Sequence, residues 1–285
     1  MDIPHVGAGQ AGACLMMIAF GVLLPFGSLI VWKIISKKPV APYFCGWLVF
    51  LLFAGVLEGI LNYIVLKPTS SGGSALVSNP ALYTAYGALA AGIFEETGRL
   101  FAFKVMLKKH TDRQTSVMYG LGHGGFEALT VLLIGGVSTL LTILSINSGA
   151  LKQQLELIAQ TNPEQVETYK AAVDQIASMS MMTGFFSVFE RIVAMVIHIS
   201  LSMVMFCAAR VKGKGWLYPA AIALHALFDV PAALYQAGVI KELAIVEVAF
   251  AVIAVPIFIF AYGVVYKKWM KELIEEEPVI IPMNT

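Results

Sequence analysis

The sequence predicts an all-α polytopic membrane protein with about seven transmembrane helices, and three observations support this fold class. The residues are 58% hydrophobic and only 13% charged, with a mean hydropathy of +0.79, far from the balance of an ordinary globular domain. The apolar residues gather in long runs, each near the roughly 20 helical residues that cross a bilayer core. Lysine and arginine are concentrated in alternate connections between these runs.

The expected spans follow one another in a single membrane domain of residues 1–285. Each long apolar run is assigned one crossing, because a hydrocarbon core of about 30 Å requires about that length of helix. We place the spans at approximately 11–34, 43–66, 81–107, 114–136, 181–208, 215–237 and 244–266. The fourth run is too long for one straight crossing, so we expect a bend at Gly135-Gly136 and an extension along the interface.

The longest connection, residues 150–178, has apolar residues at helical spacing. It also contains Asn162-Pro163, a pair typical of a helix start. We therefore expect two short amphipathic helices that lie on the outer surface of the membrane.

Basic residues orient the bundle, because short cytoplasmic loops collect lysine and arginine. Of the 19 basic residues, twelve follow the odd-numbered spans, whereas the other connections contain only Lys67, Lys152, Lys170 and Lys241. We expect a multi-pass protein of the cell membrane with its N-terminus outside and its C-terminus in the cytoplasm. The net charge of +1 and the lack of a basic patch with interleaved aromatic residues give no reason to expect a nucleic-acid partner.

Ionisable residues inside the expected spans indicate where the chemistry lies, because such a group is costly when it faces lipid. Spans three to six carry Glu95, Glu96 and Arg99; His123 and Glu127; Glu190, Arg191 and His198; and His225 and Asp229. Counted from the cytoplasmic ends, Glu96, His123, His198 and His225 all lie roughly 14 to 17 Å deep at about 1.5 Å per residue. One carboxylate and three imidazoles are therefore expected to meet at one level.

Spacing along each helix predicts a polar neighbour for these groups, since residues three or four apart share a face. Arg99 follows Glu95 by four residues and Glu96 by three. Each histidine is followed four residues later by a group that could fix its tautomer, in the pairs His123–Glu127, His198–Ser202 and His225–Asp229. The glycines of GLGHGG would let another backbone, or an extended substrate, approach closely.

The motifs EExxR, HGGFE, HxxxS and HxxxD, one on each of four successive expected helices, resemble the YhfC family of intramembrane proteases. That family is related to the CAAX prenyl-protein endopeptidases and to PrsW. The resemblance covers nearly the whole chain, and FEETGR and YGLGHGGFEA are its most specific stretches. It implies a CAAX-protease-like helical bundle. HxxxE stands here in place of FxxxH, and EExxR in place of EExxxR, so a prenylated substrate is not implied.

Roles are carried over from the resemblance motif by motif. One carboxylate of Glu95 and Glu96 is the expected general base, and His123 matches the position that shares the attacking water. His198 and His225 match the third and fourth motifs. The supporting residues are Arg99, Glu127, Ser202 and Asp229.

The expected activity is an intramembrane endopeptidase that cuts a membrane-embedded or membrane-associated protein in or near the cytoplasmic half of the bilayer. Hydrolysis needs a base for water and donors for the oxyanion, which a glutamate and histidines supply. The resemblance favours this metal-free mechanism without a cofactor. Zinc remains open, because three ligands would be available in His123, His198 and His225. A proton- or ion-coupled transporter is the rival class, since Glu, Asp and His also line ion pathways, and a relative without catalysis is a third possibility.

Overall fold

The computed structural model describes residues 5–67, 73–271 and 273, and these contain helices and connections but no strand. Within this part of the chain, six helices are long and apolar enough to cross a membrane: Ala8–Ser36, Ala41–Val65, Gln114–Asn147, Met181–Arg210, Leu217–Gln236 and Leu243–Trp269. They correspond to the first, second, fourth, fifth, sixth and seventh predicted spans. The predicted all-α polytopic membrane fold is confirmed.

The third predicted span is also helical but carries the charges of the predicted site. It consists of α5 (Pro80–Phe101) and the π-helical segment η2 (Ala102–Met106), which follow each other without a break. Glu95, Glu96, Arg99 and Lys104 all lie on it, which sets it apart from the six apolar helices. Asn79 starts α5 because its side chain accepts hydrogen bonds from the amides of Ala81 and Leu82.

The chain forms two compact units, which we describe separately. Unit 1 comprises residues 1–27 and 127–192, and unit 2 comprises residues 28–126 and 193–285. Three helices contribute residues to both units: α1 (Ala8–Ser36), α6 (Gln114–Ala128) and α10 (Met181–Arg210).

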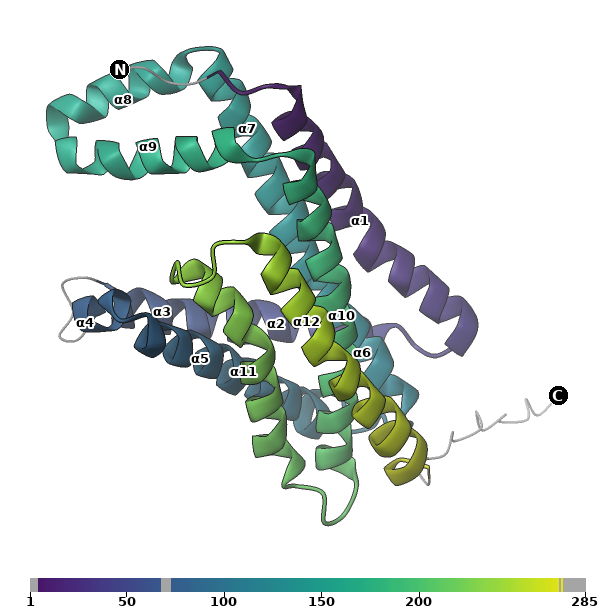
Figure 1. Ribbon diagram of the computed structural model, residues 1–285. Coiled ribbons are helices and arrows are strands. Elements are labelled where there is room, and N and C mark those ends of the chain that lie inside the picture. Colours follow the sequence, from purple (N-terminus) through teal and green to yellow (C-terminus); the bar gives the residue numbers. More distant parts are fainter. Residues whose placement is uncertain (1–4, 68–72, 272, 274–285) are drawn as a thin grey trace. The chain divides into compact units, whose positions relative to one another are not determined.

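Unit 1 is completed by η3 (Leu129–Ile134), α7 (Gly135–Asn147), α8 (Ala150–Thr161) and α9 (Pro163–Ser178). Figure 1 shows α8 and α9 as neighbouring antiparallel helices, which confirms the two helices predicted for residues 150–178. α9 begins at Pro163, because the fixed φ of proline suits a first helical turn and its missing N–H costs nothing there.

The chain remains helical through Gly135-Gly136, where a bend was expected. α6, η3 and α7 together run from Gln114 to Asn147. A Cβ on Gly136 would lie 3.0 Å from Ile18 Cγ1, so this glycine lets α7 approach α1 closely. Asn147 then ties the end of α7 to the segment before α1, since its side chain exchanges two hydrogen bonds with the Val6 backbone, of 3.0 and 2.8 Å.

Unit 2 carries the predicted catalytic residues. Besides α5 and η2 it contains α2 (Ala41–Phe50), η1 (Leu51–Glu58), α3 (Gly59–Val65), α4 (Gly73–Ser78), α11 (Leu217–Gln236), α12 (Leu243–Ile259) and η4 (Phe260–Trp269). α5 and α11 pack against each other over an extensive contact. Gly92 makes it possible, because a Cβ there would lie only 2.8 Å from the Ile222 carbonyl oxygen.

The glycines around His123 pack α6 against its neighbours in unit 2. A Cβ on Gly120 would lie 2.6 Å from Ile199 Cα of α10, and one on Gly122 would lie 1.9 Å from the Tyr43 carbonyl oxygen of α2. The sequence allowed either another helix backbone or an extended substrate beside these glycines. In the structure, the backbone of a neighbouring helix lies beside Gly120 and beside Gly122. The glycines therefore fix the position of His123 by close packing.

Candidate active site

Glu95 lies in a buried polar cluster to which four helices of unit 2 contribute. α5 supplies Glu95, Glu96 and Arg99; α6 supplies His123; α10 supplies His198; and α11 supplies His225. All six residues are buried, although the helices around them are otherwise apolar. The predicted convergence of carboxylate and imidazole groups from four helices is thus present.

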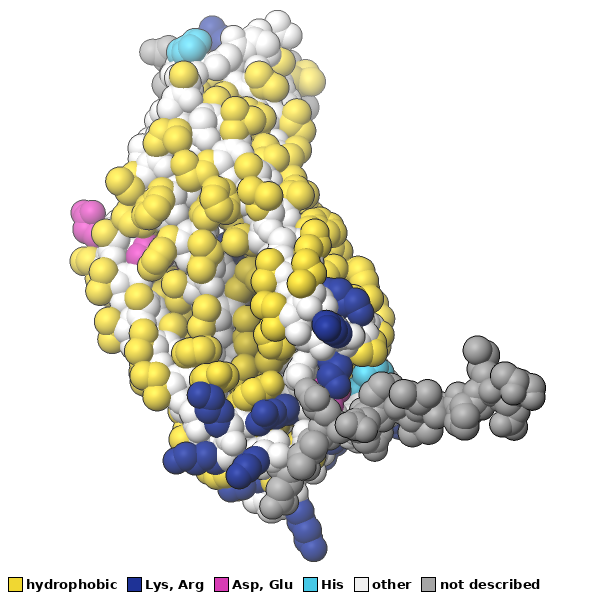
Figure 2. Space-filling model, turned by 90° about the vertical axis from the view of Figure 1, so that its right-hand side faces the viewer, with side chains coloured by type: hydrophobic (Ala, Val, Ile, Leu, Met, Phe, Trp, Pro, Cys, Tyr) yellow, Lys and Arg dark blue, Asp and Glu magenta, His cyan; other side chains and the backbone are white. Residues whose placement is uncertain are grey.

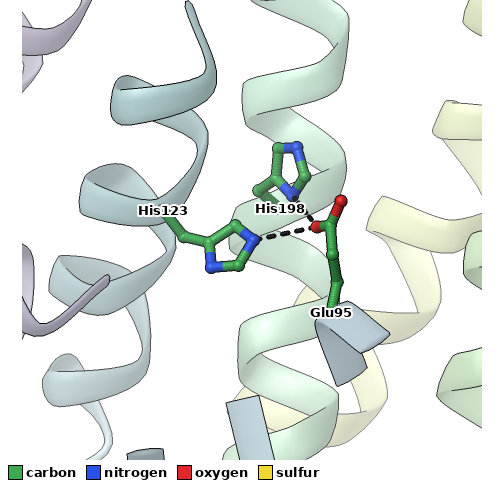
Figure 3. Close-up of side chains that lie close together, drawn as sticks. All are labelled: Glu95, His123 and His198. Carbon is green, nitrogen blue, oxygen red and sulfur yellow. Dashed lines mark hydrogen bonds and ion pairs between the residues drawn. The ribbon is translucent and has the colours of Figure 1, made fainter. Parts of the chain in front are cut away.

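One oxygen of Glu95 faces several polar groups at once. Its Oε2 forms a hydrogen bond with His123 Nε2 at 2.9 Å, and it lies 3.8 Å from His198 Nδ1 and 3.9 Å from His225 Nε2. Figure 3 shows His123 and His198 directed at this carboxylate from two different helices. Contacts of this kind compensate for the hydration that a carboxylate loses in an apolar interior.

Arg99 connects the two carboxylates with two of the histidines. Its guanidinium donates to Glu96 Oε1 and lies 3.4 Å from Glu95 Oε2, as the spacing of EExxR predicted. The same guanidinium contacts His198 Nδ1 and lies 3.4 Å from His225 Nδ1. Because an arginine has no acceptor, His198 Nδ1 accepts this bond and the ring carries its proton on Nε2. Arg99 therefore sets the tautomer of His198 as well as the positions of both glutamates.

His225 links Glu96 to a more exposed carboxylate. Its Nδ1 lies 2.7 Å from Glu96 Oε1, and its Nε2 lies 3.4 Å from Asp229 Oδ2. The Asp229 side chain is 29% exposed, whereas Glu96 is fully buried. The second oxygen of Glu96, Oε2, has no hydrogen-bond partner among the described residues. A buried carboxylate oxygen in this state is a position where a water or a ligand atom would be held.

The residues predicted to support the other two histidines have different surroundings. The Ser202 hydroxyl is buried without a hydrogen-bond partner among the described residues. Glu127 Oε1 lies 2.7 Å from an Arg191 nitrogen within unit 1, and Arg191 also contacts Glu190. The sequence spacing predicts that Glu127 orients His123, but the two ring nitrogens of His123 face Glu95 and Tyr119 instead.

Tyr119 is the contact that the sequence reasoning missed. Its hydroxyl lies 3.4 Å from His123 Nδ1, and both side chains are fully buried. It precedes His123 by four residues, so a search for polar partners one turn before the histidine, as well as one turn after it, would have found it.

Glu95, His123 and His198 have the separations of a metal-binding set. One ligand atom from each lies within 4.8 Å of the other two. Zinc bonds of about 2.0–2.2 Å would place tetrahedral ligand atoms about 3.3 Å apart. The distances of 2.9 Å from His123 and 3.8 Å from His198 to Glu95 Oε2 lie on either side of that value. The donor set therefore fits zinc, with Glu95 included where three histidines had been expected.

Comparisons with known proteins identify the family of the chain. A family model described as YhfC intramembrane metalloprotease matches residues 20–250, which include every residue of the cluster. The uncharacterized membrane protein YhfC of Bacillus subtilis (strain 168) is 33% identical over 236 residues, which cover 83% of this chain and 89% of that protein. No solved structure matches the chain.

Proposed function

The chain belongs to the YhfC family, described as intramembrane metalloproteases, and from that premise we propose that it hydrolyses peptide bonds at the Glu95 cluster. The observation that carries the proposal is the buried convergence of two carboxylates and three imidazoles from four helices of a membrane protein. Ionisable groups at such positions are expensive, and they are found where a membrane protein carries out its function. The family description is that of a protease, so it favours this function over a transporter.

Glu96 is proposed as the general base. Its Oε1 is held by Arg99 and His225, while its Oε2 has no partner among the described residues and is available to a water molecule. A carboxylate in this position would accept a proton from the water as the water attacks the scissile carbonyl. Glu96 would then give this proton to the nitrogen of the leaving amine as the C–N bond breaks. His225, between Glu96 and Asp229, would carry the proton of the product carboxyl group toward the exposed side chain of Asp229, which leaves Glu96 ionised for the next cycle.

Glu95, His123 and His198 are proposed as the residues that would hold zinc. The ion would polarise the scissile carbonyl and make the attacking water more acidic. Tyr119 would orient His123 through Nδ1, the ring nitrogen that faces away from Glu95. Arg99 contacts His198 Nδ1, the nitrogen that would bind zinc, so the guanidinium would give up this contact when zinc is bound. In the metal-free form that the motif resemblance favoured, the same imidazoles would donate to the oxyanion. The family description and the ligand separations support the zinc form.

The proposed substrate is a membrane-embedded or membrane-associated protein. We retain the orientation that the basic residues predict, with the C-terminus in the cytoplasm, and we propose cleavage in the cytoplasmic half of the bilayer. Water would reach the buried cluster from that side.

The test uses full-length protein reconstituted into liposomes with a panel of tagged single-span membrane proteins. Glu96→Gln keeps the side-chain shape but removes the base, so cleavage should fall roughly a hundredfold or more. Glu190→Gln, a carboxylate beside an arginine in unit 1, is the matched control and should cleave at the wild-type rate. Cleavage by Glu96→Gln at the wild-type rate would overturn the assignment of the base.

Elemental analysis of the same preparations decides the role of zinc. Wild type should carry about one zinc per chain, which should be lost in His123→Ala and retained in His225→Ala. A chelator should stop cleavage, and added zinc should restore it. Full activity in preparations without metal would reject the zinc form and favour the glutamate-based one.

A further inference from the structure

An apolar groove of about 720 Å³ lies between α11 and the α12–η4 helix, away from the Glu95 cluster. Its lining includes Trp216, Ala220, Ala223 and Leu227 on one side and Val252 and Phe260 on the other. The volume is within the roughly 300–1,000 Å³ of small-ligand sites. The α11 residues of the groove recur every three or four positions and share one face, about half a turn away from His225. The groove and the candidate active site therefore use opposite faces of α11.

The length of the groove corresponds to one leaflet of a bilayer. Trp216, which immediately precedes α11, and Leu227 of α11 lie eleven positions apart, a distance of about 17 Å at 1.5 Å per residue. Half of the hydrocarbon core is about 15 Å. A transmembrane helix of a partner would need a contact surface through both leaflets. A lipid acyl chain is the apolar group that occupies one leaflet.

One end of the groove is aromatic and cationic. Lys214 Nζ lies 3.5 Å from the centre of the Trp269 ring, and the rings of Trp216 and Trp269 meet edge to face at 6.1 Å. Lys267 and Lys268 are exposed on the same turn of η4 as Trp269. Tryptophan is typical of the membrane–water interface, and lysine there attracts anionic headgroups.

The two segments that carry these lysines contain no acidic residue, and Glu272 is the first acidic residue after Lys268. No Asp or Glu occurs within residues 211–218 or 256–271. Figure 2 shows Lys and Arg side chains gathered at the lower end of a face that is otherwise mainly hydrophobic. An apolar slot with this charge at one end complements a ligand with a hydrocarbon chain and a negative headgroup.

We propose that the groove binds an anionic glycerophospholipid. One acyl chain lies between α11 and α12–η4, and the phosphate contacts Lys214, Lys267 and Lys268. A zwitterionic lipid would match the apolar part but not the three positive charges. Free phosphate would match the charges but not the apolar part.

The experiment titrates detergent-purified full-length protein with phosphatidylglycerol or phosphatidylcholine and counts bound lipid by native mass spectrometry. Phosphatidylglycerol should bind at least tenfold more tightly, because each lysine near a headgroup contributes about 1 kcal/mol. The combined variant Lys214→Gln, Lys267→Gln and Lys268→Gln should lose this preference. Ala223→Phe, which fills the groove from an exposed position, should weaken the binding of both lipids.

The matched control variants carry Lys→Gln and Ala→Phe substitutions at positions outside the groove. Lys37→Gln with Lys38→Gln alters a different basic pair, and Ala85→Phe alters an exposed alanine of α5; both should bind like wild type. Thermal unfolding of every variant verifies that it is folded. Inorganic phosphate should not displace the lipid.

Five outcomes would overturn the proposal. Equal affinity for the two lipids, or an unchanged preference in the lysine variant, would reject the headgroup site. Full binding by Ala223→Phe would place the lipid elsewhere. A dimer that Ala223→Phe dissociates would assign the groove to a second copy of the chain. Residues 274–285 include Glu275, Glu276 and Glu277. If the protein preferred phosphatidylglycerol only after these residues were removed, the lipid site would be rejected for the intact protein.

Discussion

Two arginines of this protein, one buried and one partly buried, each lie between two carboxylates, and their surroundings differ in one further respect. Arg99 of unit 2 contacts Glu95 and Glu96, and Arg191 of unit 1 contacts Glu127 and Glu190. Around Arg99 there are also three imidazoles, contributed by three further helices. The sequence of residues 127–192, which holds the second cluster, contains no histidine.

The proposed function places the reaction at only one of the two clusters, although each combines an arginine with two carboxylates. In unit 1 the side chains of Arg191, Glu127 and Glu190 are 11%, 19% and 25% exposed, and Arg191 forms an ion pair with each of the two carboxylates. In unit 2 the arginine is fully buried and several imidazoles face the same carboxylate oxygen. Imidazole is the side chain that exchanges protons or binds metals near neutral pH. Chemistry is therefore assigned to the cluster with histidines.

Replacing the two arginines in parallel should give the largest contrast. Arg99→Gln should reduce cleavage roughly a hundredfold or more, because the guanidinium holds the proposed base and sets the tautomer of His198. Arg191→Gln should leave the cleavage rate within about threefold, since ion pairs outside the site affect folding more than chemistry. Initial rates in liposomes, normalised to folded protein, provide the measurement.

Two outcomes would contradict the expected difference between the two arginine variants. Equal losses in both variants would mean that the unit 1 cluster also serves the reaction. Full activity in Arg99→Gln would show that the two glutamates and His198 do not depend on this guanidinium. Arg99→Lys is a useful third variant, because lysine keeps the charge but lacks the planar fork that reaches several partners at once.

The sequence was sufficient to predict the elements that depend on local patterns. Apolar runs predicted the spans, and counting residues from the basic ends brought Glu96, His123, His198 and His225 to a common depth, where the structure has them close together. Length and charge act along one helix, so they can be read without knowing the neighbours. The same holds for the start of α9 at Pro163.

What the sequence could not predict depends on how the helices are rotated and packed. Adjacent residues on a helix differ by about 100° in direction, so the choice of Glu95 rather than Glu96 as the partner of His123 follows from the rotation of α5. Glu127 illustrates the same limit. It shares a helical face with His123, but it is 64 residues away in sequence from Arg191, with which it forms an ion pair. No local spacing indicates such a partner.

The ion pairs of Arg191 in unit 1 are expected to contribute to stability and not to cleavage. Glu127→Gln removes one carboxylate from Arg191 and should lower the free energy of unfolding by about 2 kcal/mol, less than for a fully buried pair because Glu190 remains and the side chains are partly exposed. Cleavage should stay within about twofold of wild type, since no proton transfer passes through Glu127. Thermal or denaturant unfolding in detergent, followed by tryptophan fluorescence, measures the change.

The double variant Glu127→Gln with Arg191→Gln is the control for this interpretation. A neutral pair can exchange a hydrogen bond and leaves no unpaired charge, so part of the lost stability should return. If Glu127→Gln instead abolished cleavage at unchanged stability, Glu127 would act on His123 as the sequence spacing first suggested.

The smallest predicted effect belongs to Asp229, at the outer end of the line from Glu96 through His225. Its carboxylate lies 3.4 Å from His225 Nε2 and is 29% exposed, so it would aid proton transfer without touching the substrate. Asp229→Asn should therefore lower kcat about tenfold, the lower end for residues that act through a neighbour, with KM and zinc content unchanged. Asp229→Glu should restore much of the rate, because the longer side chain keeps a carboxylate near the imidazole.

A loss of zinc or a raised KM in Asp229→Asn would instead show a contribution to metal or substrate binding. If Asp229→Asn kept the wild-type kcat, Asp229 would take no part in proton transfer, and the proposed proton path from Glu96 would end at His225.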